Sequence, residues 1–263
     1  MKRLGIALMF FLGVVGTDAV AAEPVDLELV LLADASWSID EAEISLQREG
    51  YAAGIAHPDV LDTILGGYNR RIVVTYVEWG DENFQEIVVP WTIIDGPETA
   101  AGFVAKLRAA PRIATGPNAI GSAIAAGHAL IEGNAFKGTR KVIDFSGDSA
   151  NTWNGIPIHV ARKAALADGI VINGLAILCR DCNGRPVSYD LERAFETMII
   201  GGPGSFVVTA DGNTSFTQAV LRKLLLEVAA APGEITARVS PDIAQSASRR
   251  LPSLCPRSSC TPP

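Results

Sequence analysis

The feature that most constrains the fold is an apolar run, Leu29–Ala33, that ends directly in Asp34-Ala35-Ser36-Trp37-Ser38. An uninterrupted apolar run bounded by polar residues is typical of a strand that is buried on both faces of a sheet. Such strands belong to open α/β sheets, which place their sites just beyond the carboxyl ends of the strands. One carboxylate and two hydroxyls at alternate positions therefore predict a site for a hard divalent cation.

The same segment allows a simpler interpretation. Ser38 and Glu41 have the three-residue spacing of a capping box, in which two side chains satisfy free amides at the start of a helix. Ser38 would then be a helix cap and Asp34 a turn residue, with no metal involved. The rest of the chain has to decide between the two interpretations.

Strand-like and helix-like segments alternate along the chain. Further strands are expected at 71–78, 141–145, 170–178 and 205–209, and helices at 40–56, 97–108, 118–131, 157–167, 191–200 and 215–229. This alternation predicts an α/β fold with a doubly wound, mostly parallel sheet and helices on both faces. A short segment at 86–90 ends in Pro90 and suits one antiparallel edge strand. His57-Pro58 is expected to end the first helix.

The two ends of the chain depart from this pattern. Residues 1–22 resemble a secretory signal peptide, with basic residues, a short apolar core and small residues before an expected cleavage at Glu23. We therefore expect an exported protein, periplasmic or extracellular, that has no stable insertion in a membrane. One domain is expected at residues 23–230, followed by a flexible tail containing Pro, Ser and Arg at residues 231–263.

Charge and cysteine content narrow the choice of partners. The net charge is −7 at pH 7, and an acidic chain without a basic patch does not suit nucleic acid. In an oxidising compartment the four cysteines are candidates for disulfides. Local bridges Cys179–Cys182 and Cys255–Cys260 are the simplest pairing, and crossed pairs would join the tail to the domain.

The predicted topology brings several polar residues to one edge of the sheet. If the strands at 29–34 and 141–145 are neighbours, Asp34, Ser36 and Ser38 face Asp148 where both strands end. Asn118, at the start of a helix of small residues, is expected at the same edge. Its amide oxygen can complete a set of oxygen ligands.

The order of three segments resembles the von Willebrand factor A domain. These are the Asp-x-Ser-x-Ser motif, the loop that leads into a Gly/Ala helix, and the strand before Ser146-Gly147-Asp148. More narrowly, the segments 142–148 and 76–79 resemble an uncharacterised bacterial family of secreted von Willebrand A-like proteins. The resemblance covers most of residues 25–230. It implies a metal-ion-dependent adhesion site with ligands Asp34, Ser36, Ser38, Asn118 and Asp148.

The resemblance also assigns a role to each ligand. It implies that Ser36 and Ser38 bind the cation directly, while Asp34 and Asp148 hold it largely through water. The loop threonine of the family falls on Asn118, and the nearby Thr115 is the substitute for that ligand. Mg²⁺ is the expected cation, with Mn²⁺ or Ca²⁺ as alternatives.

Such a site implies a function in protein binding. The serines are neutral and the carboxylates largely indirect, so the cation can accept an acidic side chain of another protein. Two other functions remain open: a metal-dependent phosphate-ester hydrolase, in which Asp34 or Asp148 acts with the cation, and a structural module with a degenerate, empty site. The Gly-x-Ser-x-Gly and phosphate-loop motifs are missing from the sequence, so an enzyme is not predicted.

Three tryptophans follow the same strand ends. Trp37, Trp79 and Trp153 come just after expected carboxyl ends, and we expect them to form a rim that contacts the partner. The alternative is ordinary packing beneath the loops, because tryptophan side chains are usually mostly buried.

Overall fold

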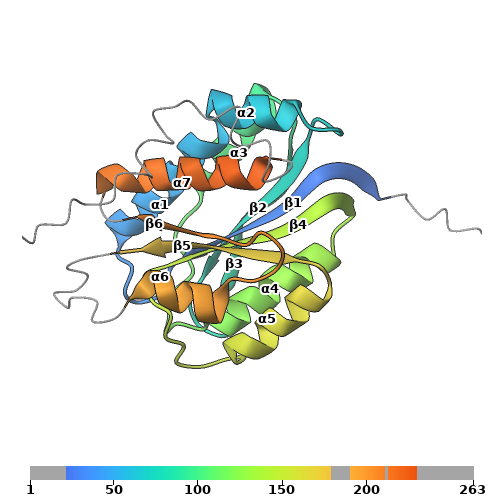
Figure 1. Ribbon diagram of the computed structural model, residues 1–263. Coiled ribbons are helices and arrows are strands. Elements are labelled where there is room, and N and C mark those ends of the chain that lie inside the picture. Colours follow the sequence, from blue (N-terminus) through green and yellow to red (C-terminus); the bar gives the residue numbers. More distant parts are fainter. Residues whose placement is uncertain (1–21, 179–189, 211–212, 230–263) are drawn as a thin grey trace, which may run out of the picture.

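The computed structural model describes residues 22–178, 190–210 and 213–229, which form one sheet between two layers of helices (Figure 1). The order of the six strands is β3-β2-β1-β4-β5-β6. Five strands are parallel: β1 (Glu23–Asp34), β2 (Ile72–Trp79), β4 (Phe136–Gly147), β5 (Val171–Ile177) and β6 (Val207–Ala210). The edge strand β3 (Gln85–Ile94) runs antiparallel to β2. The predicted fold class, including its antiparallel edge strand, is confirmed.

The helices cover the two faces of the sheet (Figure 1). One face carries α1 (Glu41–Ile55), α2 (Pro58–Leu65), α3 (Pro97–Ala109) and α7 (Asn213–Val228). The opposite face carries α4 (Ile120–Glu132), α5 (Ile158–Ala167), and α6 (Leu191–Ala194) with its π-helical extension (Phe195–Ile199).

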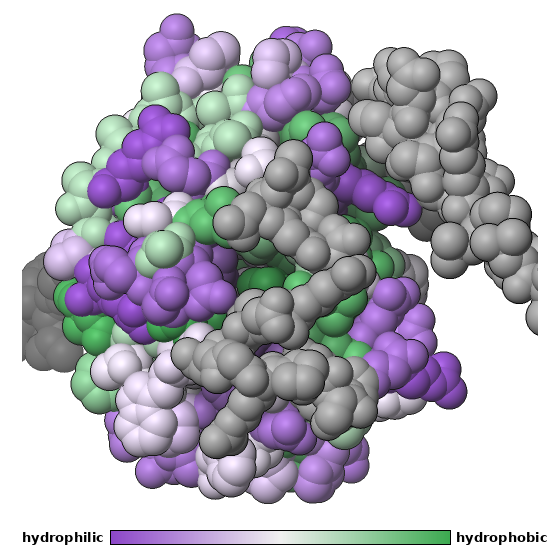
Figure 2. Space-filling model, turned by 90° about the vertical axis from the view of Figure 1, so that its left-hand side faces the viewer, coloured by the Kyte–Doolittle hydropathy of each residue, from purple (hydrophilic) through white to green (hydrophobic). Residues whose placement is uncertain are grey.

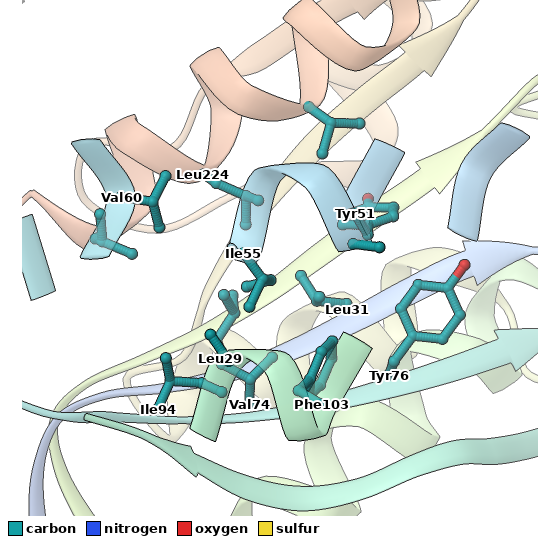
Figure 3. Packing of buried hydrophobic residues seen from close by; sticks show 14 of the residues in the cluster. Leu29, Leu31, Tyr51, Ile55, Val60, Val74, Tyr76, Ile94, Phe103 and Leu224 are labelled. Carbon is teal, nitrogen blue, oxygen red and sulfur yellow. The ribbon is translucent and has the colours of Figure 1, made fainter. Parts of the chain in front are cut away.

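The central strand β1 contributes to a hydrophobic core on each face, because successive side chains of a strand point to opposite sides. Leu29 and Leu31 pack in the core beneath α1, α2, α3 and α7, where Phe103 and Leu224 meet them (Figure 3). Val30 and Leu32 lie in the second core, beneath α4 and α5. Burial on both faces explains why this strand has no polar residue between Leu29 and Ala33.

Two boundaries differ from the prediction. The first helix does end near His57, but α2 begins at once, because Pro58 is tolerated at the first helical position and the His57 side chain accepts a hydrogen bond from the amide of Asp59. The edge strand continues through Pro90 to Ile94. Its pairing with β2 is irregular between Val74 and Tyr76, and a strand edge with such a bulge accommodates proline.

In the part of the chain that the structure describes, no helix combines the length and the apolar character needed to cross a membrane.

Candidate metal centre

The parallel strands end at one edge of the sheet, here called the carboxyl edge, which faces the viewer in Figure 2. Three segments meet there: 35–40 after β1, 110–119 before α4, and 148–157 after β4. The amide of Trp37 donates to the carbonyl of Gly116 at 2.9 Å, and the amide of Trp153 donates to the carbonyl of Asn118 at 2.8 Å. These backbone hydrogen bonds bring together the three segments that carry the predicted ligands.

The Asp-x-Ser-x-Ser segment turns directly at the end of β1. The amide of Ser36 donates to Asp34 Oδ1 at 2.9 Å, and the hydroxyls of Ser36 and Ser38 lie 3.1 Å apart. Gln47 of α1 donates to the carbonyl of Asp34 at 2.9 Å and so holds the end of the strand. Asp34 and Ser36 are fully buried. The turn thus gathers one carboxylate and two hydroxyls.

The capping-box interpretation of Ser38 and Glu41 is wrong. Helix α1 begins after Asp40, whose side chain accepts from the amide of Glu43 at 2.9 Å, and the Glu43 side chain accepts from the amide of Asp40 at 2.8 Å. The box is therefore shifted by two residues. The Ser38 hydroxyl instead hydrogen-bonds to the carboxylate of Asp148.

The two carboxylates of the site are buried close to one another. Burial, followed by the negative charge of Asp148, raises the pKa of Asp34 to about 8. Burial likewise raises the pKa of Asp148, against a hydrogen bond from Ser38 that lowers it. Asp34 Oδ2 and Asp148 Oδ1 are buried without a hydrogen-bond partner in the structure. Within the described residues, no lysine, arginine or histidine forms an ion pair with either carboxylate.

These properties fit a divalent cation. Unpaired buried carboxylates destabilise a fold unless positive charge or a proton compensates them, and the available donors are all oxygens, as hard cations require. No group of three His, Cys, Asp or Glu side chains forms a metal cluster in the ranges described above. A cation here therefore depends on hydroxyl and amide oxygens in addition to the two carboxylates.

The two residues considered for the loop ligand differ in burial. Asn118 is buried, and its carbonyl accepts hydrogen bonds from the amide of Trp153 and from Thr152 Oγ1. Thr115 is exposed, and its carbonyl accepts from the amide of Asp81 at 3.1 Å, in the turn after β2. Between them, Gly116 adopts a φ of +115°, which favours glycine. Burial favours Asn118 as the ligand.

The tryptophan rim requires one correction. Trp37 and Trp153 are 72% and 77% exposed, but Trp79 is fully buried. The Trp79 ring stacks on Phe145 at 5.0 Å between centroids, and its Nε1 donates to the carbonyl of Ser146 at 3.3 Å. Trp79 is the last residue of β2 and still lies within the sheet. Its side chain therefore fills the core beneath the site and is not part of the rim.

Sequence reasoning missed the contribution of Gly147. A Cβ atom at this position would lie 3.2 Å from Asp34 Oδ2 and 3.4 Å from the Trp79 ring. The contact with Asp34 Oδ2 is tighter than an ordinary van der Waals contact, so a side chain here would push against the candidate site. The only signal in the sequence is the position of this glycine, directly before Asp148.

Sequence reasoning also missed a second buried cluster, deeper between the sheet and α7. Lys223 Nζ lies 2.6 Å from Asp144 Oδ1 and 2.5 Å from Glu227 Oε1, and all three side chains are buried. Burial, followed by the charge of Asp144, raises the pKa of Glu227 to about 8. Asn173 donates to Glu227 Oε1 at 3.2 Å. Charged residues inside otherwise apolar segments were the signal for this cluster.

The fold places the chain in a known class. It is similar to the pilus adhesin SpaC from Lactobacillus rhamnosus GG (TM-score 0.54, 15% identity, 78% of this chain and 30% of the adhesin). It is also similar to a von Willebrand factor type A structure from Catenulispora acidiphila (TM-score 0.53, 13% identity, 76% of this chain and 42% of that one). A third similar structure is proximal thread matrix protein 1 from the mussel byssus with a zinc-occupied adhesion motif (TM-score 0.52, 15% identity, 80% and 49%). These likenesses show a von Willebrand factor A-like fold, and this chain spans less than half of each of the three.

Residues 24–232 match one family along most of the chain, and the protein belongs to that family, described as "Protein of unknown function (DUF1194)". No curated protein matches the sequence.

Proposed function

We propose that this chain is an exported protein-binding module that captures an acidic side chain of a partner through a divalent cation, with Mg²⁺ as the first choice. The observation that carries the proposal is the buried pair Asp34 and Asp148, which has oxygens without hydrogen-bond partners and no ion pair among the described residues. A bound cation would supply the missing positive charge and a coordination position for a carboxylate.

The ligands proposed are those that the sequence suggested. Ser36 and Ser38 would hold the cation through their hydroxyls, and Asp34 and Asp148 would neutralise it, largely through water. Asn118 would add its amide oxygen. The hydrogen bonds from Gln47 to the Asp34 carbonyl and from Trp153 to the Asn118 carbonyl support these positions before any cation binds.

Similar structures support this choice of function over an enzyme. One is named as a pilus adhesin and another as a matrix protein whose adhesion motif holds zinc. At 15% identity these structures share the fold with this chain, and the proposed metal and partner rest on the chain's own residues.

The remaining predictions concern the ends of the chain. We propose a domain at residues 23–230, a signal peptide at residues 1–22 and a tail at residues 231–263. The four cysteines, Cys179, Cys182, Cys255 and Cys260, lie outside the described residues, as do residues 1–21 and 230–263. Mass spectrometry of the purified protein, with and without reduction, would test cleavage before Glu23 and the pairing of the cysteines.

The metal proposal is tested by calorimetric titration of Mg²⁺, Mn²⁺, Ca²⁺ and Zn²⁺ into the purified exported protein. We expect saturable binding that is lost in Asp34→Asn, while the same change at the exposed Asp62 on α2 has no effect. An absence of binding to the wild type would contradict the proposal and support a structural module. Turnover of generic phosphate esters that disappears in Asp34→Asn would instead favour a hydrolase.

A further inference from the structure

Two exposed tryptophans flank the segment that carries Asn118. The backbone amide of Trp37 is bound to the carbonyl of Gly116, and that of Trp153 to the carbonyl of Asn118, two residues further along. Both rings are more than two-thirds exposed. These backbone hydrogen bonds therefore place two large, exposed aromatic side chains on either side of the segment that carries the candidate ligand Asn118.

The surroundings of both tryptophans are acidic. Asp40 and Glu41 follow Trp37 closely in the sequence, and both are exposed. On the other side, Asn154 donates to Asp81 Oδ1 at 3.1 Å, which places the acidic turn Asp81-Glu82 against the segment of Trp153.

Basic residues are scarce in the described segments that follow β1, β2 and β4 and precede α4 at the carboxyl edge. In the segments 35–40, 80–84, 110–119 and 148–157, Arg112 is the only lysine or arginine. Its guanidinium is already engaged: it donates to the carbonyls of Ala35 and Ile39 and lies 3.6 Å from Glu41. The described part of the rim therefore presents carboxylates and tryptophan faces without a free basic group. Figure 2 shows strongly hydrophilic side chains beside paler ones on this side of the molecule.

This combination suits cationic side chains. The face of an indole ring attracts an ammonium or guanidinium group, most strongly when the contact excludes water, and nearby carboxylates raise the local concentration of such groups. A partner with only acidic residues would be repelled by the rim even if one of its carboxylates reached the cation.

We propose that the partner presents a carboxylate between basic side chains, so that the carboxylate reaches the candidate metal site while arginine or lysine side chains lie over Trp37 and Trp153. The position of the carboxylate rests on the proposed function, whereas the contacts with the tryptophans do not need the cation. The two parts of the recognition can therefore fail separately.

The test uses short synthetic peptides, titrated into the exported protein in the presence of Mg²⁺ or of a chelator. The parent peptide is Ser-Arg-Ser-Asp-Ser-Arg-Ser. In the asparagine peptide, asparagine replaces the aspartate. In the glutamine peptide and the leucine peptide, that residue replaces both arginines. We expect the loss of either the aspartate or the arginines to weaken binding by roughly ten-fold, since tryptophans and charged contacts dominate interfaces of this kind.

Substitutions in the protein complete the test. We expect Trp37→Ala and Trp153→Ala each to weaken binding of the parent peptide by roughly five-fold or more. Both variants should bind the glutamine peptide about as well as the wild type does. Tyr68→Ala is the matched control, because Tyr68 is 96% exposed but precedes β2, at the other end of the sheet. Thermal unfolding of each variant would verify that the fold is intact.

The outcomes separate the two proposals. The proposal of basic side chains on the partner would be overturned if the parent, glutamine and leucine peptides bound equally, or if the leucine peptide bound more tightly. This holds even if binding still depended on Mg²⁺ and the aspartate. Binding that depends on the arginines and on both tryptophans, but not on Mg²⁺ or the aspartate, would support the rim and contradict the proposed function.

Discussion

Two clusters of buried carboxylates lie on the same sheet, and they are neutralised in different ways. Asp144 and Glu227 share the ammonium group of Lys223, at 2.6 and 2.5 Å. Asp34 and Asp148 lie at the carboxyl edge, and the described chain offers them hydroxyls and amides but no ion pair. Asp144 lies within β4 and Asp148 follows its last residue, Gly147, so two carboxylates only four positions apart in the sequence are neutralised differently.

The difference indicates what each cluster is for. A buried charge must be paired or take up a proton, because its desolvation is not repaid otherwise. The inner cluster carries its own cation and so contributes to the structure. The outer cluster has no ion pair among the described residues, and this is the property on which the proposed metal site rests.

The largest effect is expected from removal of the internal cation. Lys223→Met should destabilise the protein by about 3–5 kcal/mol, because it leaves buried carboxylates without their partner. Urea unfolding would measure the loss. Lys141→Met is the control: Lys141 is half-buried and pairs with Glu132 near the surface, so its removal should cost under about 1 kcal/mol. A similar small loss for Lys223 would show that the inner cluster is not held by its lysine.

A change of opposite sign is expected at the outer cluster. Asp34→Asn should raise the free energy of unfolding of the metal-free protein by about 2 kcal/mol at neutral pH, since the pKa of Asp34, raised to about 8, makes this carboxyl costly to bury. The same variant should lose any stabilisation by Mg²⁺. Thermal unfolding with a chelator and with Mg²⁺ measures both effects. A destabilised metal-free variant would mean that the fold needs the Asp34 carboxylate even without a cation.

The dependence of stability on pH sharpens the comparison further. The pKa of Glu227 is raised from its ordinary 4.5 to about 8 in the folded state, so between these pH values the folded state holds a proton that the unfolded state has released. The stability from this group is therefore complete below pH 4.5 and is lost as the pH rises through 8. Between pH 6 and 8, the free energy of unfolding of Glu227→Gln should fall by about 1 kcal/mol less than that of the wild type. Urea unfolding over that range, compared with the wild type, would detect it, and an unchanged slope would contradict it.

Much of the fold could be predicted from local pattern, but burial at the site could not. The apolar run of β1 and the alternation of strands and helices predict the doubly wound sheet, because both follow from which faces must be buried. Trp79 was misplaced because the end of a strand in the sequence does not show whether its last side chain lies inside the sheet. The capping box was misplaced by two residues because Ser38 and Asp40 both suit the start of a helix.

The inner cluster shows a second limit. Asp144 lies within an apolar strand and Lys223 and Glu227 lie four residues apart on a late helix, about 80 residues further along the chain. Each of them alone is an ordinary exception to an apolar pattern. Only the packing of α7 against β4 and β5 brings them together, and no local signal specifies that contact.

The smallest effect is expected at the loop ligand, where Asn118 and Thr115 compete for one role. Asn118→Ala should weaken Mg²⁺ binding by about five-fold, or about 1 kcal/mol, because it removes one oxygen ligand. The fold should be retained, since the hydrogen bonds from Trp153 and Thr152 reach the backbone carbonyl of Asn118, which the substitution keeps. Thr115→Ala should leave the affinity within about two-fold, because the Thr115 side chain is exposed. Calorimetric titration of both variants decides the matter: a larger loss in Thr115→Ala would mean that the loop turns its threonine toward the cation, and that the burial of Asn118 only supports the packing of the loop.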